Sequence, residues 1–211
     1  MGERAPLTEL DKDQVAKDLA ADTVTFIDTR SANEVHAGTV TRSLNIPASA
    51  AIATYGAWVV NPEKDTNPLV LLATSQDHAQ EIWDHLVRVG IDNVAGYVTS
   101  LDGLPTTTPA LIQPEDLAEV DAAMILDVRN RTEHTAGHVP GAHQLNGGRL
   151  MWHLNELPTD GRIVTYCQSG LRNSVAASAL RRAGYNVVEL DGSYSAWNAY
   201  QQARQSAPAA K

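Results

Sequence analysis

Hydrophobic and polar positions follow one another along the chain in an order that predicts alternating strands and helices. Short apolar runs bounded by turn residues indicate buried strands, and longer segments with apolar residues at helical spacing indicate helices. The order helix, strand, strand, glycine-terminated helix, strand occurs twice. The expected segments are helix 7–21, strands 24–28, 69–73 and 93–97 and a helix ending at Gly90, then helix 114–120, strands 124–127, 163–166 and 186–190 and a helix ending at Gly184.

The two halves also share sequence. FIDTRSANEVHAGTV from Phe26 matches ILDVRNRTEHTAGHV from Ile125 at an offset of 99, and LVRVGIDNV from Leu86 matches LRRAGYNVV from Leu180 at an offset of 94. A period near one hundred residues is too long for a solenoid, so we expect each copy to be a domain. The fold class is predicted to be α/β, with domains 1–105 and 106–211, each a parallel sheet flanked by helices.

Charge and composition narrow the possible partners. The 211 residues carry a formal charge of -9, which argues against nucleic acid as a partner. No run approaches the roughly 18 apolar residues of a membrane span, and the first residues lack the apolar core of a secretory signal, so we expect no membrane partner and a cytoplasmic location. The single cysteine, Cys167, excludes an internal disulfide.

Cys167 lies where ligands bind in sheets of this kind. It directly follows a predicted strand and precedes a predicted helix, in the turn YCQSGLRNS. A loop that curls there points backbone N–H groups inward, and the helix dipole adds positive potential. Gly170 permits the curl, Ser169 can donate a hydroxyl hydrogen bond, and Arg172 adds a cation. A lone cysteine is most often a small buried hydrophobe, but this setting favours an anion-binding loop and a thiolate.

At these residues the chain resembles the rhodanese family of sulfurtransferases in its tandem form. The matching pieces are CQSGLR from Cys167, LDVRNRTEH from Leu126, GHVPGA from Gly137 and DGSYSAW from Asp191. The resemblance implies that the Cys167 thiolate takes a sulfane sulfur from a small anionic donor, thiosulfate or a persulfide. The resulting cysteine persulfide then passes that sulfur to a thiol or cyanide acceptor.

The resemblance also implies roles for further residues. Arg172 is expected to contact the anionic donor. Asp127, Arg129 and Glu133 are expected to be a structural signature, and no cofactor or metal is implied. The outer sulfur is expected to be held by the backbone amides of the loop residues Gln168, Ser169, Gly170, Leu171 and Arg172.

The first copy departs from the pattern at the loop. The offset of 94 places Ala73 at the cysteine position and His78 at the arginine position, so we expect a catalytically inactive first domain. In the second copy, Ser193 replaces the second glycine of the usual closing motif and Asn173 follows the loop arginine. Neither departure removes a chemical group that the mechanism needs, and both leave the acceptor preference open.

Two alternative functions remain. The stretch LNIPASAAIATYGAWVV from Leu44 resembles rhodanese pairs fused to metallo-β-lactamase-fold persulfide dioxygenases, so the chain could be a sulfur-relay or regulatory module serving such a dioxygenase. A cysteine phosphatase is less favoured. Phosphatases of the dual-specificity type resemble this fold but have five residues between cysteine and arginine, whereas here there are four.

His134 and His138 have the spacing of a zinc site on a helix, but Gly137 and Pro140 break any continuing helix and no third ligand is evident. We therefore expect no metal. The tryptophans are expected in the core or at a domain interface; they are Trp58, Trp83, Trp152 and Trp197.

Overall fold

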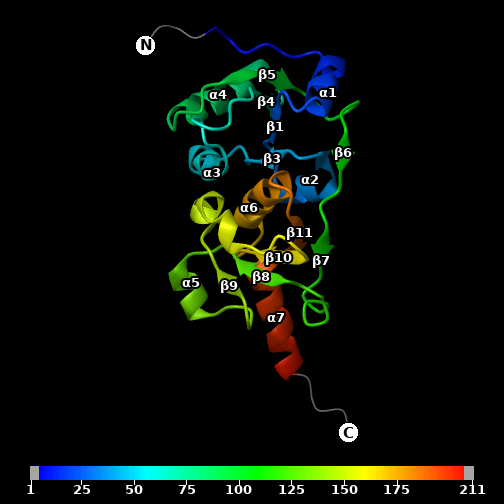
Figure 1. Ribbon diagram of the computed structural model, residues 1–211, viewed down its shortest axis with the longest axis vertical. Coiled ribbons are helices and arrows are strands. Elements are labelled where there is room, and N and C mark those ends of the chain that lie inside the picture. The colour runs from blue at the N-terminus through cyan, green and yellow to red at the C-terminus, as the bar shows by residue number, and fades with distance from the viewer. Residues whose placement is uncertain (1–4, 207–211) are drawn as a thin grey trace. The chain divides into compact units, whose positions relative to one another are not determined.

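The computed structural model describes residues 5–206 and confirms the α/β class, with two parallel sheets flanked by helices (Figure 1). The chain divides into two compact units, Met1–Pro109 (unit 1) and Ala110–Lys211 (unit 2). Within residues 5–206, no helix combines the length and the apolar character that crossing a bilayer requires.

Unit 1 is built on a four-stranded parallel sheet of order β3-β1-β4-β5. A short antiparallel pair, β2 with β6, lies outside this sheet. The strands are β1 (Thr25–Asp28), β2 (Thr39–Val40), β3 (Leu44–Asn45), β4 (Leu69–Leu72), β5 (Val94–Val98) and β6 (Thr106–Thr107), and the helices are α1 (Lys12–Ala20), α2 (Ala32–Ala37), α3 (Ile52–Val59) and α4 (Gln76–Val87).

Unit 2 is built on a five-stranded parallel sheet of order β7-β11-β10-β8-β9. Its strands are β7 (Leu111–Ile112), β8 (Met124–Asp127), β9 (His143–Gln144), β10 (Arg162–Tyr166) and β11 (Asn186–Leu190). Its helices are α5 (Arg131–Ala136), α6 (Leu171–Arg182) and α7 (Ser193–Ser206), with 3-10 helices η1 (Gly147–Trp152) and η2 (Leu154–Glu156).

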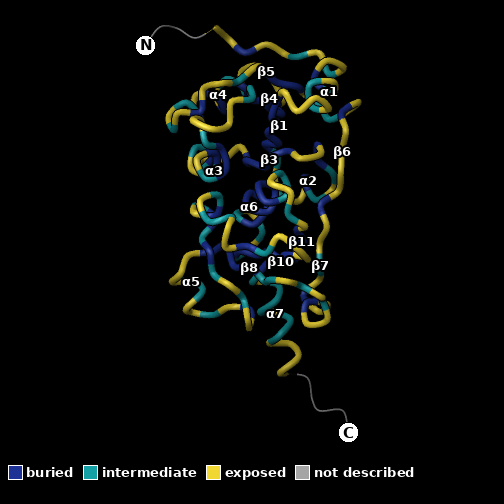
Figure 2. The backbone as a smooth tube through the Cα atoms, in the orientation of Figure 1, coloured by how far each residue is buried: buried dark blue, intermediate teal, exposed yellow. Residues whose placement is uncertain are grey.

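Residues 163–166 of the central strand β10 are buried (Figure 2), as expected of a parallel strand that is covered on both faces. Ile163 belongs to a cluster that contains Ala177 and Leu180 of α6, and Val164 belongs to a second cluster that Trp197 of α7 packs against. Successive strand residues point to opposite faces, so α6 and α7 cover different faces of this sheet. The carboxyl end of β10 is thereby fixed between two helices.

The first helix of each half differs from the sequence expectation. The N-terminal helix begins only at Lys12, because the Asp11 side chain caps it by accepting from the Gln14 N–H at 2.9 Å. Segment 114–120 is a run of turns with no helix, in which Asp116 N–H donates to the Gln113 carbonyl. The segment is too short to offset the cost of helix nucleation, and Leu117 is buried without it.

The four tryptophans differ in how far they are buried. Trp83 is buried at 9% exposure, and Trp58 and Trp197 are half-buried. Trp152 is 73% exposed, so its expected place in a core is wrong. It ends η1, whose buried side rests on Leu150, and this register leaves the indole facing outward.

Candidate active site

The expected loop leaves β10 at Cys167 and enters α6 at Leu171. Gly170 caps the helix with φ +107°, in the region that favours glycine, and this turn brings its N–H to 3.2 Å from Cys167 Sγ. The Ser193 hydroxyl lies 3.9 Å from the same sulfur. Cys167 is only 1% exposed. The Gly170 N–H and the Ser193 hydroxyl can each stabilise negative charge on Cys167 Sγ.

The start of α7 holds the loop through its backbone. Tyr194 N–H donates to the Cys167 carbonyl and Ser195 N–H to the Gln168 carbonyl, both at 3.0 Å. The Gln168 side chain also donates to Ser195 Oγ at 3.0 Å. Gln168 is half-buried, whereas Ser169 and Leu171 are exposed. The first half of the loop is therefore anchored and its middle faces outward.

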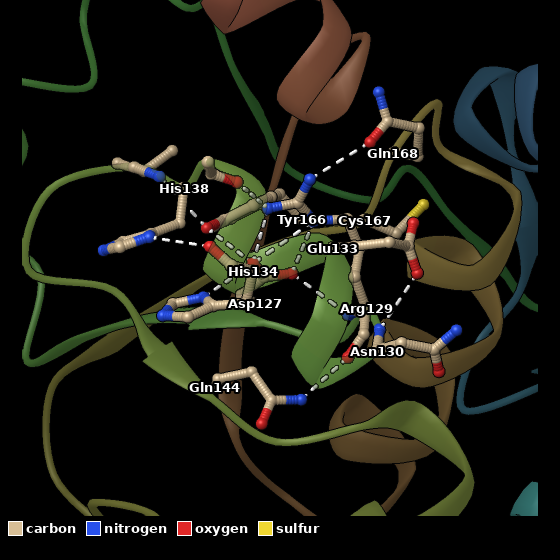
Figure 3. Close-up of polar contacts among 12 residues, drawn as sticks. Asp127, Arg129, Asn130, Glu133, His134, His138, Gln144, Tyr166, Cys167 and Gln168 are labelled. Carbon is tan, nitrogen blue, oxygen red and sulfur yellow. Dashed lines mark hydrogen bonds and ion pairs between the residues drawn. The ribbon is translucent and has the colours of Figure 1, made fainter.

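A buried ion pair lies beside the loop (Figure 3). Arg129 donates through Nε to Asp127 Oδ1 at 2.9 Å and through Nη2 to Oδ2 at 2.7 Å. The same Nη2 donates to the Gly137 carbonyl at 2.8 Å, and Nη1 donates to Gln168 Oε1 at 3.0 Å. Arg129 thus joins the strand β8 to the first residue after the cysteine.

Asp127 is fully buried and receives further hydrogen bonds. Tyr166 Oη donates to Asp127 Oδ2 at 3.0 Å, and His134 Nδ1 lies 2.9 Å from the same oxygen. Burial raises the pKa of Asp127, but the hydrogen bonds from Arg129 and His134 outweigh it and hold that pKa below its ordinary value. Burial raises the pKa of Tyr166, so its hydroxyl remains a proton donor.

Arg172 does not lie free beside the sulfur. Its guanidinium pairs with Glu133 of α5, with Nη1 2.7 Å from Oε2 and Nη2 2.7 Å from Oε1. The Arg172 hydrogen bond lowers the pKa of Glu133. The two side chains are 23% and 28% exposed, so an anion that approaches Arg172 meets the Glu133 carboxylate as well. The sequence placed Glu133 in a structural signature and gave no sign of this pairing, which joins residues 39 positions apart.

His134 and His138 contact each other, and His134 also contacts the buried ion pair. Their rings stack with centroids 3.9 Å apart, and His138 Nδ1 lies 2.9 Å from the His134 carbonyl oxygen. His134 Nδ1 is engaged by Asp127. Over residues 5–206, no group of three or more His, Cys, Asp or Glu side chains is placed to hold a metal ion.

Unit 1 has a pocket at the equivalent edge of its sheet. Ala73 follows β4 and is buried, and His78 accepts from the Thr74 N–H through Nδ1 at 3.2 Å. The Thr74 N–H therefore donates to the His78 side chain and is not available to an anion. The pocket has a volume of about 640 Å³ and is lined by residues that include Arg30, Glu34, Ala73, Thr74, His78 and Asp102.

Ser193 is the site contact that sequence reasoning missed. The signal was present, since a serine stands where the closing motif usually has glycine, but the pattern alone treated it as a neutral departure. The structure places it against the cysteine, because the turn before α7 returns to the end of β10.

The comparisons with known proteins agree with this architecture. The family model "Rhodanese-like domain" matches residues 112–200. The thiosulfate sulfurtransferase GlpE of Pseudoalteromonas translucida is 30% identical over 91 residues, which cover 43% of this chain and 87% of that protein. A sulfurtransferase of Allochromatium vinosum is 34% identical over 82 residues, which cover 38% of this chain and 77% of that protein.

Solved structures show weaker overall similarity. The Bacillus anthracis structure titled CoADR-RHD matches with a TM-score of 0.43 and 28% identity, over 46% of this chain and 18% of its own. A thiosulfate sulfurtransferase from Pseudomonas aeruginosa matches with a TM-score of 0.40 and 23% identity, over 92% of this chain and 40% of its own. The sequence relatives, by contrast, are covered over most of their length, and from them and the matching family model it follows that this chain belongs to the rhodanese family.

Proposed function

We propose that this protein is a sulfurtransferase that carries a sulfane sulfur as a persulfide on Cys167. The Cys167 thiolate attacks the outer sulfur of thiosulfate, the S–S bond of the donor breaks, and sulfite leaves with the bonding electron pair. An acceptor such as cyanide or a thiolate then attacks the outer sulfur of the persulfide. The second S–S bond breaks and returns its electron pair to Cys167. A small persulfide can replace thiosulfate as the donor.

The observation that carries this proposal is the inward-facing amide of Gly170, whose nitrogen lies 3.2 Å from Cys167 Sγ at the start of a helix. Charge on sulfur at this point meets a backbone donor and the positive end of α6. The loop amides from Gln168 to Arg172 are the proposed cradle for the outer sulfur. The named sulfurtransferases among the relatives support the same chemistry.

Donor binding has to open the contact between Arg172 and Glu133. We assign Arg172 to the anionic donor, which would compete with the Glu133 carboxylate for the guanidinium. The Asp127–Arg129 pair acts on the loop indirectly, through the Gln168 side chain. It is a positioning element and not a group that reacts.

Unit 1 is proposed to be a second, catalytically inactive rhodanese-like domain. Its Arg30 pairs with Asp28 and donates to the Gly38 carbonyl at 2.7 Å, which repeats the arrangement of Arg129 with Asp127 and Gly137. Ala73 supplies no nucleophile. The inactive unit is expected to support unit 2 without taking up sulfur.

A sulfur-relay role, serving a persulfide dioxygenase, is the second candidate. The ion pair of Arg172 with Glu133 favours this role, because a carboxylate beside the guanidinium slows capture of a dianion such as thiosulfate. A relay module would load sulfur from a small persulfide and turn over slowly with thiosulfate and cyanide. Steady-state rates with the two donors at equal enzyme concentration separate the two roles.

The decisive experiment is an intact mass after incubation with thiosulfate or glutathione persulfide. The expected result is an adduct of one sulfur atom that cyanide removes and that Cys167→Ser abolishes. An unchanged mass with both donors would refute the proposal. Hydrolysis of an aryl phosphate by the wild-type chain, lost in Cys167→Ser, would instead indicate a phosphatase.

A further inference from the structure

Ser193 occupies a backbone conformation that favours glycine and directs its side chain to the cysteine. Its φ is +56°, and it follows Gly192 at φ +60°. Ser193 therefore combines a glycine-type turn with a hydroxyl group next to Cys167 Sγ.

The Ser193 hydroxyl has two contacts, both with Cys167. Ser193 is fully buried, and its Oγ accepts from the Cys167 N–H at 3.3 Å. An oxygen that accepts this bond still has one proton to donate, and a buried hydroxyl proton needs an acceptor. The acceptor that the structure gives it is Cys167 Sγ, at 3.9 Å. Ser193 is thus a side-chain donor to the sulfur, in addition to the backbone donor at Gly170.

We propose that the Ser193 hydroxyl stabilises the Cys167 thiolate as it leaves the persulfide, and so speeds the release of sulfur to the acceptor. This inference rests on the proposed function and deepens it. In the release step the acceptor forms a bond to the outer sulfur, the bond between the two sulfurs breaks, and its electron pair moves onto Cys167 Sγ.

The hydroxyl acts on release more than on loading because the charge moves. In the persulfide the negative charge lies on the outer sulfur, and the inner Sγ is a poor acceptor. During release the charge returns to Sγ, so the bond from Ser193 strengthens toward the transition state. During loading the charge starts on Sγ, and the same bond stabilises the reactant. Ser193 therefore favours release without favouring attack on the donor.

The test compares Ser193→Gly and Ser193→Ala with the wild type. Both remove the hydroxyl, but glycine relieves the backbone conformation and alanine does not. Ser206→Ala is the matched control, because Ser206 lies at the far end of α7, where its hydroxyl donates to the Gln202 carbonyl. Each protein is loaded with thiosulfate, freed of excess donor and mixed with cyanide. The single-turnover rate of thiocyanate formation is measured separately from the rate of loading.

We expect release to slow about tenfold in both Ser193 variants, the effect of losing one hydrogen bond to a charged group. Loading is expected to stay equal or to quicken, and Ser206→Ala is expected to match the wild type. Release at the wild-type rate in both variants would overturn the role of Ser193. So would slow release in Ser193→Ala alone, since that result means a backbone effect. Failure of the wild type to load from either thiosulfate or glutathione persulfide would instead refute the proposed function itself.

Discussion

The ion pair of Asp127 with Arg129 allows a quantitative prediction, because the pair of Asp28 with Arg30 in unit 1 provides a control. Asp127→Asn keeps the shape of the side chain but leaves the Arg129 guanidinium buried without its counter-charge, at 2% side-chain exposure. Removing one partner of a buried pair costs about 3–5 kcal/mol. The equivalent change in unit 1, Asp28→Asn, leaves Arg30 at 27% exposure, where water can solvate it. There we expect about 1.5–3 kcal/mol, the contribution of hydrogen bonds to a charged group.

Hydrogen exchange on peptides from each unit, measured across a urea series, gives the two losses separately. With a slope of roughly 2 kcal/mol per molar urea, Asp127→Asn should lower the midpoint of unit 2 by about 2 M. Asp28→Asn should lower the midpoint of unit 1 by less. Equal losses in the two units, or a loss below about 1 kcal/mol for Asp127→Asn, would refute the assignment of the cost to a buried unpaired charge.

The same variant has a signature in pH. Because the folded-state pKa of Asp127 lies below its ordinary value, the ionised carboxylate stabilises the fold above that ordinary value, about 3.9. This contribution is lost as pH falls through the lower folded-state pKa. Asp127→Asn should therefore lose less stability than the wild type as pH falls from about 5 to below that ordinary value. An identical acid dependence in the two proteins would contradict the reasoning.

Three further predictions concern the loop. Glu133→Gln removes the negative charge opposite the Arg172 guanidinium and should speed loading with thiosulfate about fivefold at low salt, equivalent to about 1 kcal/mol between half-exposed charges; equal loading rates would exclude competition by Glu133. In Gly170→Ala and in Gly184→Ala the added Cβ meets no atom within 4 Å, so each variant should lose about 1–2 kcal/mol of stability through backbone strain. Only Gly170→Ala should also slow the loading of sulfur, measured by intact mass. Ala73→Cys in a Cys167→Ser background should not load sulfur, because the Thr74 N–H is held by His78; a cyanide-labile adduct would contradict this.

The strands and the position of the cysteine could be predicted because they depend on local pattern. The apolar run that ends at Tyr166 and the glycine three residues after Cys167 are readable without any tertiary contact, and β10 lies where the pattern places it. Helix α6 begins at Leu171, inside the segment YCQSGLRNS that the pattern assigns to the turn. Segment 114–120 was predicted as a helix from the same kind of pattern. The segment forms turns because it is too short to offset the cost of helix nucleation, and apolar spacing alone does not show that cost.

The contacts within the candidate site depend on residues distant in sequence. Arg172 pairs with Glu133, and Ser193 approaches Cys167, across 39 and 26 positions. Charge and residue type show that such partners exist, but only the packing of α5 and α7 against the end of β10 selects them. The sequence therefore indicated which side chains matter more reliably than which of them meet.

The repeated arrangement of aspartate, arginine and glycine carbonyl has a functional consequence. Arg30 and Arg129 make the same contacts in their own units, yet only Arg129 reaches the residue after the strand-end cysteine. The arginine hydrogen bonds that stabilise each unit are thus distinct from the Arg129 hydrogen bond that positions the cysteine loop. On the proposed assignment of unit 1 as an inactive rhodanese-like domain, the loss of a nucleophile from that unit leaves its framework of hydrogen bonds intact, and reactivity is confined to unit 2.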